Sequence, residues 1–175
     1  MLAYTRGLIG PMDYTPGGFR NVAPDKFRAR GDLPMVADDA LRTGWAMYVV
    51  YDSPLAAVAD SPDTYAESPA GLEFIREVPA SWDETRFLAG EVGEFVVVAR
   101  RKGKTWYLGA MNAETARRVR VPLDFLGGKR AEVTLWADGA APDAVAKTSR
   151  TLTGPDVLEL ELAATGGAVA VLRPR

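Results

Sequence analysis

The sequence has neither cysteine nor histidine among its 175 residues. Without cysteine the chain can form no disulfide and no thiolate metal site. Without histidine it cannot use a Ser-His-Asp triad, a histidine base or the common imidazole-ligated metal sites. Any acid–base chemistry in this chain must therefore use Asp, Glu, Lys or Tyr.

Long apolar runs and an excess of one charge are missing too. No segment approaches the roughly 20 apolar residues of a membrane span, and the start MLAYTRGLIG lacks the basic region and long apolar core of a signal peptide. The formal net charge is −2, so no general attraction to nucleic acid or anionic membranes is expected. We therefore predict neither a nucleic-acid nor a membrane partner, and no export signal in the chain as written.

The most apolar stretch is a predicted β-hairpin. Its arms are Glu94–Arg100 and Thr105–Met111, joined by a basic turn at Gly103. Both arms are apolar on both faces, so both faces should be covered. Downstream patterns predict a small antiparallel sheet or sandwich, with strands over Arg118–Leu123, Arg130–Ala137, Val145–Leu152, Val157–Leu162 and Ala168–Leu172.

The first part of the chain is predicted to mix helices and strands. An almost wholly apolar helix is expected over Ala40–Asp52, and a second from Ser68 to Pro79, with Ser61–Glu67 as a loop. Strands are expected within Leu2–Met12 and over Trp82–Leu88. These elements are too few to surround the first helix, and they look like the last quarter of a (β/α)8 barrel, which needs about 250 residues. The predicted fold class is thus mixed α/β and then all-β: the last part of a barrel over 1–90, followed by an antiparallel β domain over 91–175.

Four segments resemble one family of enzymes. They are TRGLIGPMDYTPGGF (Thr5–Phe19), YVVYDSPLAAVADSP (Tyr48–Pro62), the whole of Val78–Asn112 with its WDETR and GEVGE motifs, and VPLDFLGG (Val121–Gly128). They resemble the late barrel and the C-terminal domain of glycoside hydrolase family 97. The resemblance implies bacterial enzymes, usually periplasmic or exported, that act on α-glucosides or α-galactosides with retention or inversion. It also implies an N-terminal β super-sandwich, a (β/α)8 barrel with calcium in the active site, and a C-terminal β domain.

The resemblance assigns no catalytic residue and no metal ligand to this chain. The family's acid/base and calcium-ligating glutamates lie upstream of the position that matches Thr5. No calcium is therefore expected in this chain, although the full-length family binds it. Family members also tend to have a histidine near the start of the Ala40–Asp52 helix, where this chain reads DDALRTGWAM.

Six residues are candidate contacts to a sugar substrate. Glycoside hydrolysis needs two carboxyl groups, about 5–5.5 Å apart for retention or about 6.5–9.5 Å for inversion, and aromatic rings stack on sugars. The candidates are Asp13, Tyr14, Trp82, Asp83, Glu84 and Arg86. Structural interpretations compete with this one, because Asp13 would cap the loop before Pro16, Glu84 would pair with Arg86, and the aromatic rings would be core residues.

Two further surfaces have open interpretations. Trp106 and Trp136 would form either a carbohydrate-stacking platform or part of the core. The basic run Arg100–Lys104 would be either an anion site or a solvated hairpin tip.

Three hypotheses about function follow. In the first, the chain is the C-terminal part of a family 97-like hydrolase and is inactive alone. In the second, it has a non-catalytic role, in which the β domain stabilises the barrel, mediates oligomerisation or binds glycan weakly. In the third, it is a gene remnant without activity. The expected partners are an oligosaccharide in the full-length enzyme, and either the rest of the barrel or a second copy. The second copy would associate through apolar surface left uncovered on the Ala40–Asp52 helix and the two flanking strands.

Overall fold

The computed structural model describes residues 2–16, 41–67, 69–139 and 145–175. The helical elements precede the sheet strands, except for one short 3-10 turn. They are η1 (Leu2–Tyr4), η2 (Arg6–Leu8), α1 (Leu41–Val50), α2 (Pro62–Glu67), α3 (Pro69–Glu77) and η4 (Asp124–Leu126). None of the helices in these ranges is long and apolar enough to cross a membrane.

Within the described ranges, eight strands form two antiparallel sheets. They are β1 (Glu84–Glu91), β2 (Phe95–Lys102), β3 (Thr105–Asn112), β4 (Arg117–Pro122), β5 (Ala131–Asp138), β6 (Val145–Leu152), β7 (Val157–Leu162) and β8 (Gly167–Pro174). The large sheet has the order β1-β2-β3-β8-β5-β6, and β4 pairs with β7 in the small one. The last strand, β8, therefore lies in the middle of the large sheet, between β3 and β5.

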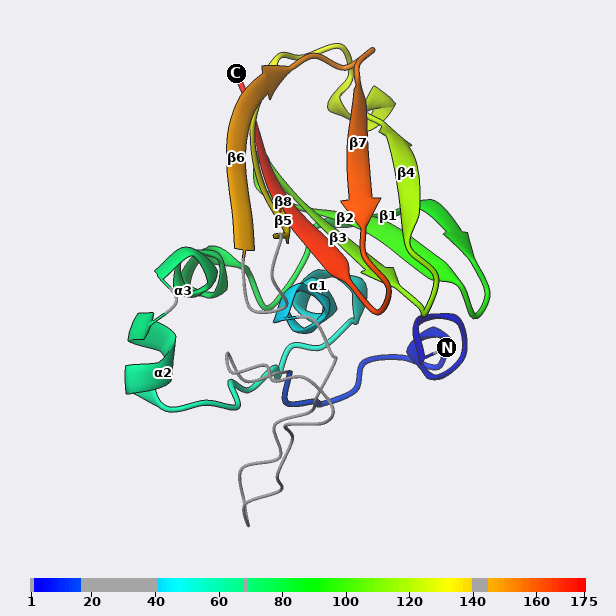
Figure 1. Cartoon of the computed structure of the whole chain (residues 1–175). Coiled ribbons are helices and arrows are strands. Elements are labelled where there is room, and N and C mark those ends of the chain that lie inside the picture. The colour runs from blue at the N-terminus through cyan, green and yellow to red at the C-terminus, as the bar shows by residue number, and fades with distance from the viewer. Residues whose placement is uncertain (1, 17–40, 68, 140–144) are drawn as a thin grey trace.

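The main core lies between the two sheets (Figure 1). In β7, Leu158, Leu160 and Leu162 are buried while Glu159 and Glu161 are exposed. Because side chains alternate across a strand, this sequence can bury one face and hydrate the other. The core is almost entirely aliphatic, with Val97, Leu108, Val121, Leu123, Val133, Ala170 and Leu172 among its buried members.

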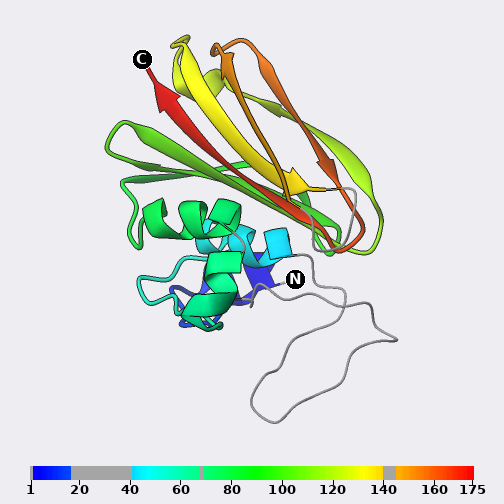
Figure 2. The ribbon, with the colours of Figure 1, turned by 60° about the vertical axis from the view of Figure 1, so that its left-hand side comes forward.

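Helices α1 and α3 cover the opposite face of the large sheet, as Figure 2 shows. Trp45 and Val49 of α1 pack with Tyr107 of β3 and Val171 of β8. The helix comes close at Gly109 of β3, where an added Cβ would lie 2.9 Å from the carbonyl oxygen of Ala46. Glycine is needed there because no side chain fits between the helix and the strand.

The predictions for the all-β part are confirmed. The hairpin forms as β2 and β3, and its two faces are buried in different cores, Val97 and Leu108 on one side and Val98 and Tyr107 on the other. All five downstream strands are present, with β6 and β7 at the predicted bounds. Pro122 ends β4, as its missing N–H requires.

Several predictions for the first part are wrong. Leu2–Met12 contains 3-10 turns instead of a strand, since Gly7, Gly10 and Pro11 interrupt it. The predicted Ser61–Glu67 loop is largely helix α2, because Pro62 suits a first helical turn and the Ser61 hydroxyl accepts a hydrogen bond from the Thr64 N–H at 3.3 Å. Helix α1 is also covered more fully than expected, with Trp45, Ala46 and Val49 at most 1% exposed.

The strand predicted over Trp82–Leu88 is present as β1, but its partners differ from the prediction. It pairs antiparallel with β2, from Glu84–Arg101 to Glu91–Phe95, and forms one edge of the large sheet. Among the described residues, the parallel pairing that a barrel would require is limited to one isolated bridge between Tyr14 and Ala56. A barrel segment is therefore not seen in the described ranges. The predicted division between 1–90 and 91–175 falls inside β1 and stays a prediction.

Candidate functional site

The six candidate residues lie in two groups that come from different elements. Asp13 and Tyr14 lie in the segment that runs beside the end of α1, where the Met12 N–H donates to the Asp52 carbonyl at 3.2 Å. Trp82, Asp83, Glu84 and Arg86 lie at the start of β1, beside the β2–β3 turn. The structure thus places Asp13 on a different element from Asp83 and Glu84.

Tyr14 is held by the end of α1. Its hydroxyl donates to the Met47 carbonyl at 2.6 Å, and its ring meets the Tyr51 ring edge-on at 5.4 Å. Burial, chiefly, raises the pKa of the Tyr14 phenol far above its ordinary value. The phenol is therefore a neutral, structural hydrogen-bond donor. Asp13, next to it, is exposed.

Arg100 of β2 links the two groups and was not identified as a site residue from the sequence. It is 6% exposed and donates to the Asp52 carboxylate at 3.2 Å and to the Val50 carbonyl at 3.3 Å. Its guanidinium lies 6.0 Å from the Trp82 ring centroid, and its charge acts on Tyr14. Burial lowers the Arg100 pKa, and Asp52 opposes that shift. Arg100 thus places a cation at the C-terminal end of α1, where it satisfies the Val50 carbonyl.

The burial of Arg100 shows that the solvated-tip interpretation of Arg100–Lys104 does not hold for the whole run. Lys102, Gly103 and Lys104 are exposed as expected, whereas Arg100 is buried. The available sequence signal was a cation directly after the apolar run Val96–Ala99, on the face that helix α1 covers.

The carboxylates of Asp83 and Glu84 are bound by a backbone N–H of the β2–β3 turn and by neighbouring cations of β1 and β2. Asp83 accepts the Gly103 N–H at 2.7 Å and lies 3.4 Å from Lys102, and these contacts hold its pKa below the ordinary value, the Gly103 N–H contributing most. Glu84 accepts from Arg86 Nε at 2.6 Å and from Arg101 Nε at 3.1 Å. Both guanidinium groups lower the Glu84 pKa, with Arg86 as the first cause. The predicted Glu84–Arg86 pair is therefore confirmed.

The tryptophans serve mainly as packing residues. Trp106 and Trp136 are 5% and 1% exposed, which confirms the core interpretation over an open stacking platform. The Phe125 ring lies 4.8 Å from the Trp106 ring, and the guanidinium groups of Arg86 and Arg101 lie 5.6 and 5.8 Å from the Trp106 ring centroid. Trp82 is half-buried and meets Tyr107 edge-on at 5.4 Å.

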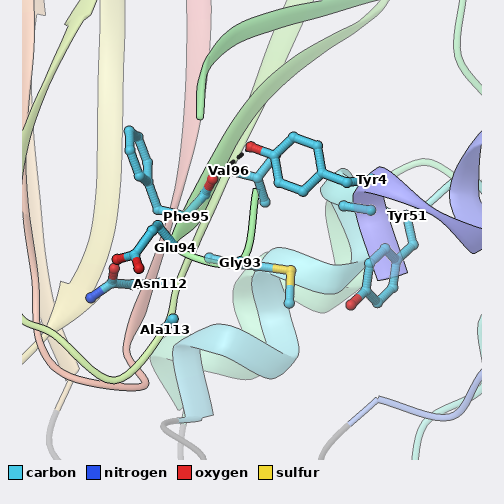
Figure 3. A pocket seen from close by; sticks show the side chains of 10 residues that line it. Tyr4, Tyr51, Gly93, Glu94, Phe95, Val96, Asn112 and Ala113 are labelled. Carbon is cyan, nitrogen blue, oxygen red and sulfur yellow. Dashed lines mark hydrogen bonds between the residues drawn. The ribbon is translucent and has the colours of Figure 1, made fainter. Parts of the chain in front are cut away.

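Two hollows lie along the β1–β2–β3 part of the sheet. One, of about 160 Å³, lies between the N-terminal turn and the β1–β2 turn. Figure 3 shows the hydroxyl of Tyr4, from the N-terminal turn, directed at the Phe95 carbonyl, to which it donates a hydrogen bond of 2.6 Å. The other hollow, of about 640 Å³, lies at the β2–β3 turn and includes Glu84, Arg86, Arg101 and Trp106.

The chemistry of these carboxylates does not fit glycosidic catalysis. A glycosidase acid needs a raised pKa, whereas the pKa values of Asp83 and Glu84 are lowered. Among the described residues, no group of three or more Asp or Glu side chains is placed to hold a metal ion. The described residues thus do not supply the cluster of carboxylates that a calcium ion would need.

The fold is an antiparallel two-sheet β domain with a helical layer on one face, and this architecture defines the class of protein. The chain belongs to the glycosyl-hydrolase 97 family. Residues 81–173 match the family model that describes the C-terminal domain of these enzymes and gives its role as oligomerisation. The resemblance noted in the sequence is thereby confirmed.

Named relatives agree with this assignment. The chain is 40% identical to the retaining alpha-galactosidase of Bacteroides thetaiotaomicron over 139 residues, which is 79% of this chain and 21% of that protein. It is 37% identical to a probable retaining alpha-galactosidase of Streptomyces bingchenggensis, over 97% of this chain and 25% of that protein. The structure of a glycoside hydrolase family 97 enzyme from Pseudoalteromonas sp. strain K8, solved in complex with acarbose, is also similar. The match covers 100% of this chain and 28% of that enzyme's chain, with 36% sequence identity and a TM-score of 0.86. The chain thus spans about a quarter of the length of these relatives.

Proposed function

We propose that this chain is the C-terminal part of a family 97 glycoside hydrolase that cleaves α-galactosidic or α-glucosidic bonds. Its β domain supports assembly, and the catalytic glutamates belong to the rest of the enzyme, so the chain alone does not hydrolyse glycosides. One observation favours this most strongly: a quarter of a family 97 enzyme superimposes on the whole chain at a TM-score of 0.86.

The α-galactoside in this proposal comes from the names of the two curated relatives. The α-glucoside comes from the resemblance described above. The absence of activity is supported by the carboxylates of Asp83 and Glu84, because both are tied to cations and have lowered pKa values. Helices α1 to α3 would join the β domain to the barrel of the complete enzyme.

Self-association or contact with the rest of the enzyme is supported by exposed apolar side chains. The most exposed are Leu8 and Ile9, at 79% and 82%, followed by Leu55, Val92 and Phe87. Tyr4 links two of these regions, because its ring lies edge-on to Phe87 at 6.3 Å. Covering such side chains is favourable at about 25 cal/mol per Å² of apolar area. This N-terminal apolar surface, defined by Leu8, Ile9, Phe87 and Val92, is the interface we expect.

Two measurements test the proposal. The purified chain should give no turnover of 4-nitrophenyl α-galactoside or α-glucoside above a boiled sample, and reproducible hydrolysis would refute the inactivity. Light scattering should detect association that the double substitution Phe87→Ser/Val92→Ser reduces. A matched control, Glu159→Ser/Glu161→Ser on the outer face of β7, should leave the association unchanged.

A further inference from the structure

The larger of the two hollows is a groove with a strongly basic lining. It lies where the β2–β3 turn, the η4 turn and the end of β8 come together, at the end of the sheet marked by the C-terminus in Figure 2. Its volume of about 640 Å³ is within the range of small-molecule sites. We call it the basic groove, and its charged and aromatic lining residues are Glu84, Arg86, Arg101, Lys104, Trp106, Phe125, Lys129 and Arg175.

Positive charge dominates the basic groove. Glu84 is the acidic lining residue, and it neutralises parts of Arg86 and Arg101. Arg175 pairs with Glu132 at 2.7 Å, outside the lining. Among the described residues, Lys104 and Lys129 belong to no ion pair. Two uncompensated ammonium groups therefore face the same hollow as two oriented guanidinium groups.

The two arginines are oriented before any ligand arrives. Glu84 accepts from both of them, and each guanidinium lies over the Trp106 ring. Stacking and hydrogen bonding restrict the rotamers of both guanidinium groups in the free protein. A bound anion would therefore cost less conformational entropy than it would at mobile surface arginines.

We propose that the basic groove binds an acidic saccharide, a short glycan with carboxylate or sulfate groups. The lysines supply the charge, the arginines supply fixed donors, and the half-buried ring of Phe125 offers an apolar surface to a sugar ring. A long polyanion such as nucleic acid fits less well, because the chain as a whole has a net charge of −2 and no general attraction to polyanions is expected. The site lies on the β domain itself and goes beyond the proposed glycoside hydrolysis.

Trigalacturonate is the probe that tests this site, and maltotriose and inorganic sulfate are its comparisons. Isothermal titration of the full chain at low salt should detect trigalacturonate, with weaker binding of sulfate and none of maltotriose. Lys104→Gln/Lys129→Gln should reduce the association constant by roughly tenfold, the combined effect of two exposed charges. The matched control Arg120→Gln, on the outer face of β4, should bind like the unchanged chain. Circular dichroism checks that both variants fold.

Three outcomes would overturn the inference. They are equal affinity in the lysine variant and the control, equal affinity for maltotriose and trigalacturonate, and sulfate binding as strong as that of the trisaccharide. The last would indicate an anion site without saccharide recognition. The titration involves no hydrolysis, so its failure is distinguishable from a failure of the proposed function.

Discussion

The two faces of the large sheet differ in what they bury. The face toward β4 and β7 is packed with leucine, valine and alanine from strands that alternate regularly. The face toward the helices buries Trp45, Phe74, Tyr107 and Trp136, and also the cation Arg100. Strands β2, β3 and β8 contribute to both faces. A regular aliphatic core therefore closes the domain, whereas the aromatic and polar face fixes where the helices lie.

The largest effect is expected from Trp45→Ala on the helical face. Removing this fully buried ring should lower the free energy of unfolding by about 3–5 kcal/mol. The matched change on the other face, Leu160→Ala, should cost about 2–5 kcal/mol. Because β3 and β8 are shared, both variants should unfold in one transition when urea titrations are followed by circular dichroism.

One result would contradict this picture of a shared sheet. If Trp45→Ala melts the helical signal early while the strand signal keeps its original midpoint, the two faces are independent units. The exposed control Glu161→Ala should stay within about 0.5 kcal/mol of the unchanged chain.

A smaller effect is expected from Gly109→Ala. The new Cβ would lie 2.9 Å from the Ala46 carbonyl oxygen and from Val49 Cβ, so α1 must shift. Overpacking of this kind costs about 1–3 kcal/mol and should speed amide exchange in α1. Gly103→Ala is the matched comparison, because its Cβ meets nothing within 4 Å and only its φ of +58° is unfavourable, at about 1 kcal/mol. Faster exchange in α1 for Gly103→Ala alone would contradict the close approach.

The charged pair beneath α1 should respond asymmetrically to substitution. Arg100→Met replaces the buried cation by an apolar chain of similar length, so the free energy of unfolding should change by less than about 1 kcal/mol. Asp52→Ala leaves the guanidinium without its counter-ion and should cost about 1–2 kcal/mol, moderated because the Asp52 side chain is 52% exposed. In a double-mutant cycle, Asp52→Ala should cost almost nothing once Arg100 is Met. Additive costs would mean that the pair does not interact.

The smallest effect is a pH dependence at the β2–β3 turn. The folded-state pKa values of Asp83 and Glu84 lie below their ordinary values, so the unfolded chain binds protons more readily. These contacts therefore stabilise the fold at pH values above the ordinary carboxyl pKa, which is near 4. The stabilisation is lost as the pH falls through the lower pKa values of the folded state. Asp83→Asn/Glu84→Gln should flatten the melting temperature between about pH 5 and pH 3. An unchanged slope in this variant would show that other groups cause the acid sensitivity.

Local alternation was enough to predict the strands that bury a single face. Val157–Leu162 alternates leucine with glutamate, and β7 has those bounds. The same reasoning failed for Leu2–Met12, where Leu8 and Ile9 suggested a buried strand but are highly exposed. The apolar residues of this segment lie on the surface, and their hydrophobicity alone cannot distinguish an exposed apolar surface from a buried core.

Long-range strand pairing and the burial of a charged side chain could not be predicted from the sequence. The start of β1 was found, but nothing in its residues indicates that Glu84 lies opposite Arg101 and not in a barrel. Of the candidate sugar contacts, Glu84 and Arg86 do line a hollow, while Asp13 and Tyr14 lie elsewhere. Arg100 was missed because its partners, Asp52 and Val50, are about 50 positions away in the chain.

The central place of β8 has a consequence for the order of events during synthesis. Strands β3 and β5 have no hydrogen-bonded neighbour on their inner edges until Gly167–Pro174 has left the ribosome. Trp45 and Tyr107 are made much earlier, yet they share a cluster with Val169 and Val171 of that strand. The nascent polypeptide therefore cannot complete this aromatic cluster until almost all of the domain has been translated.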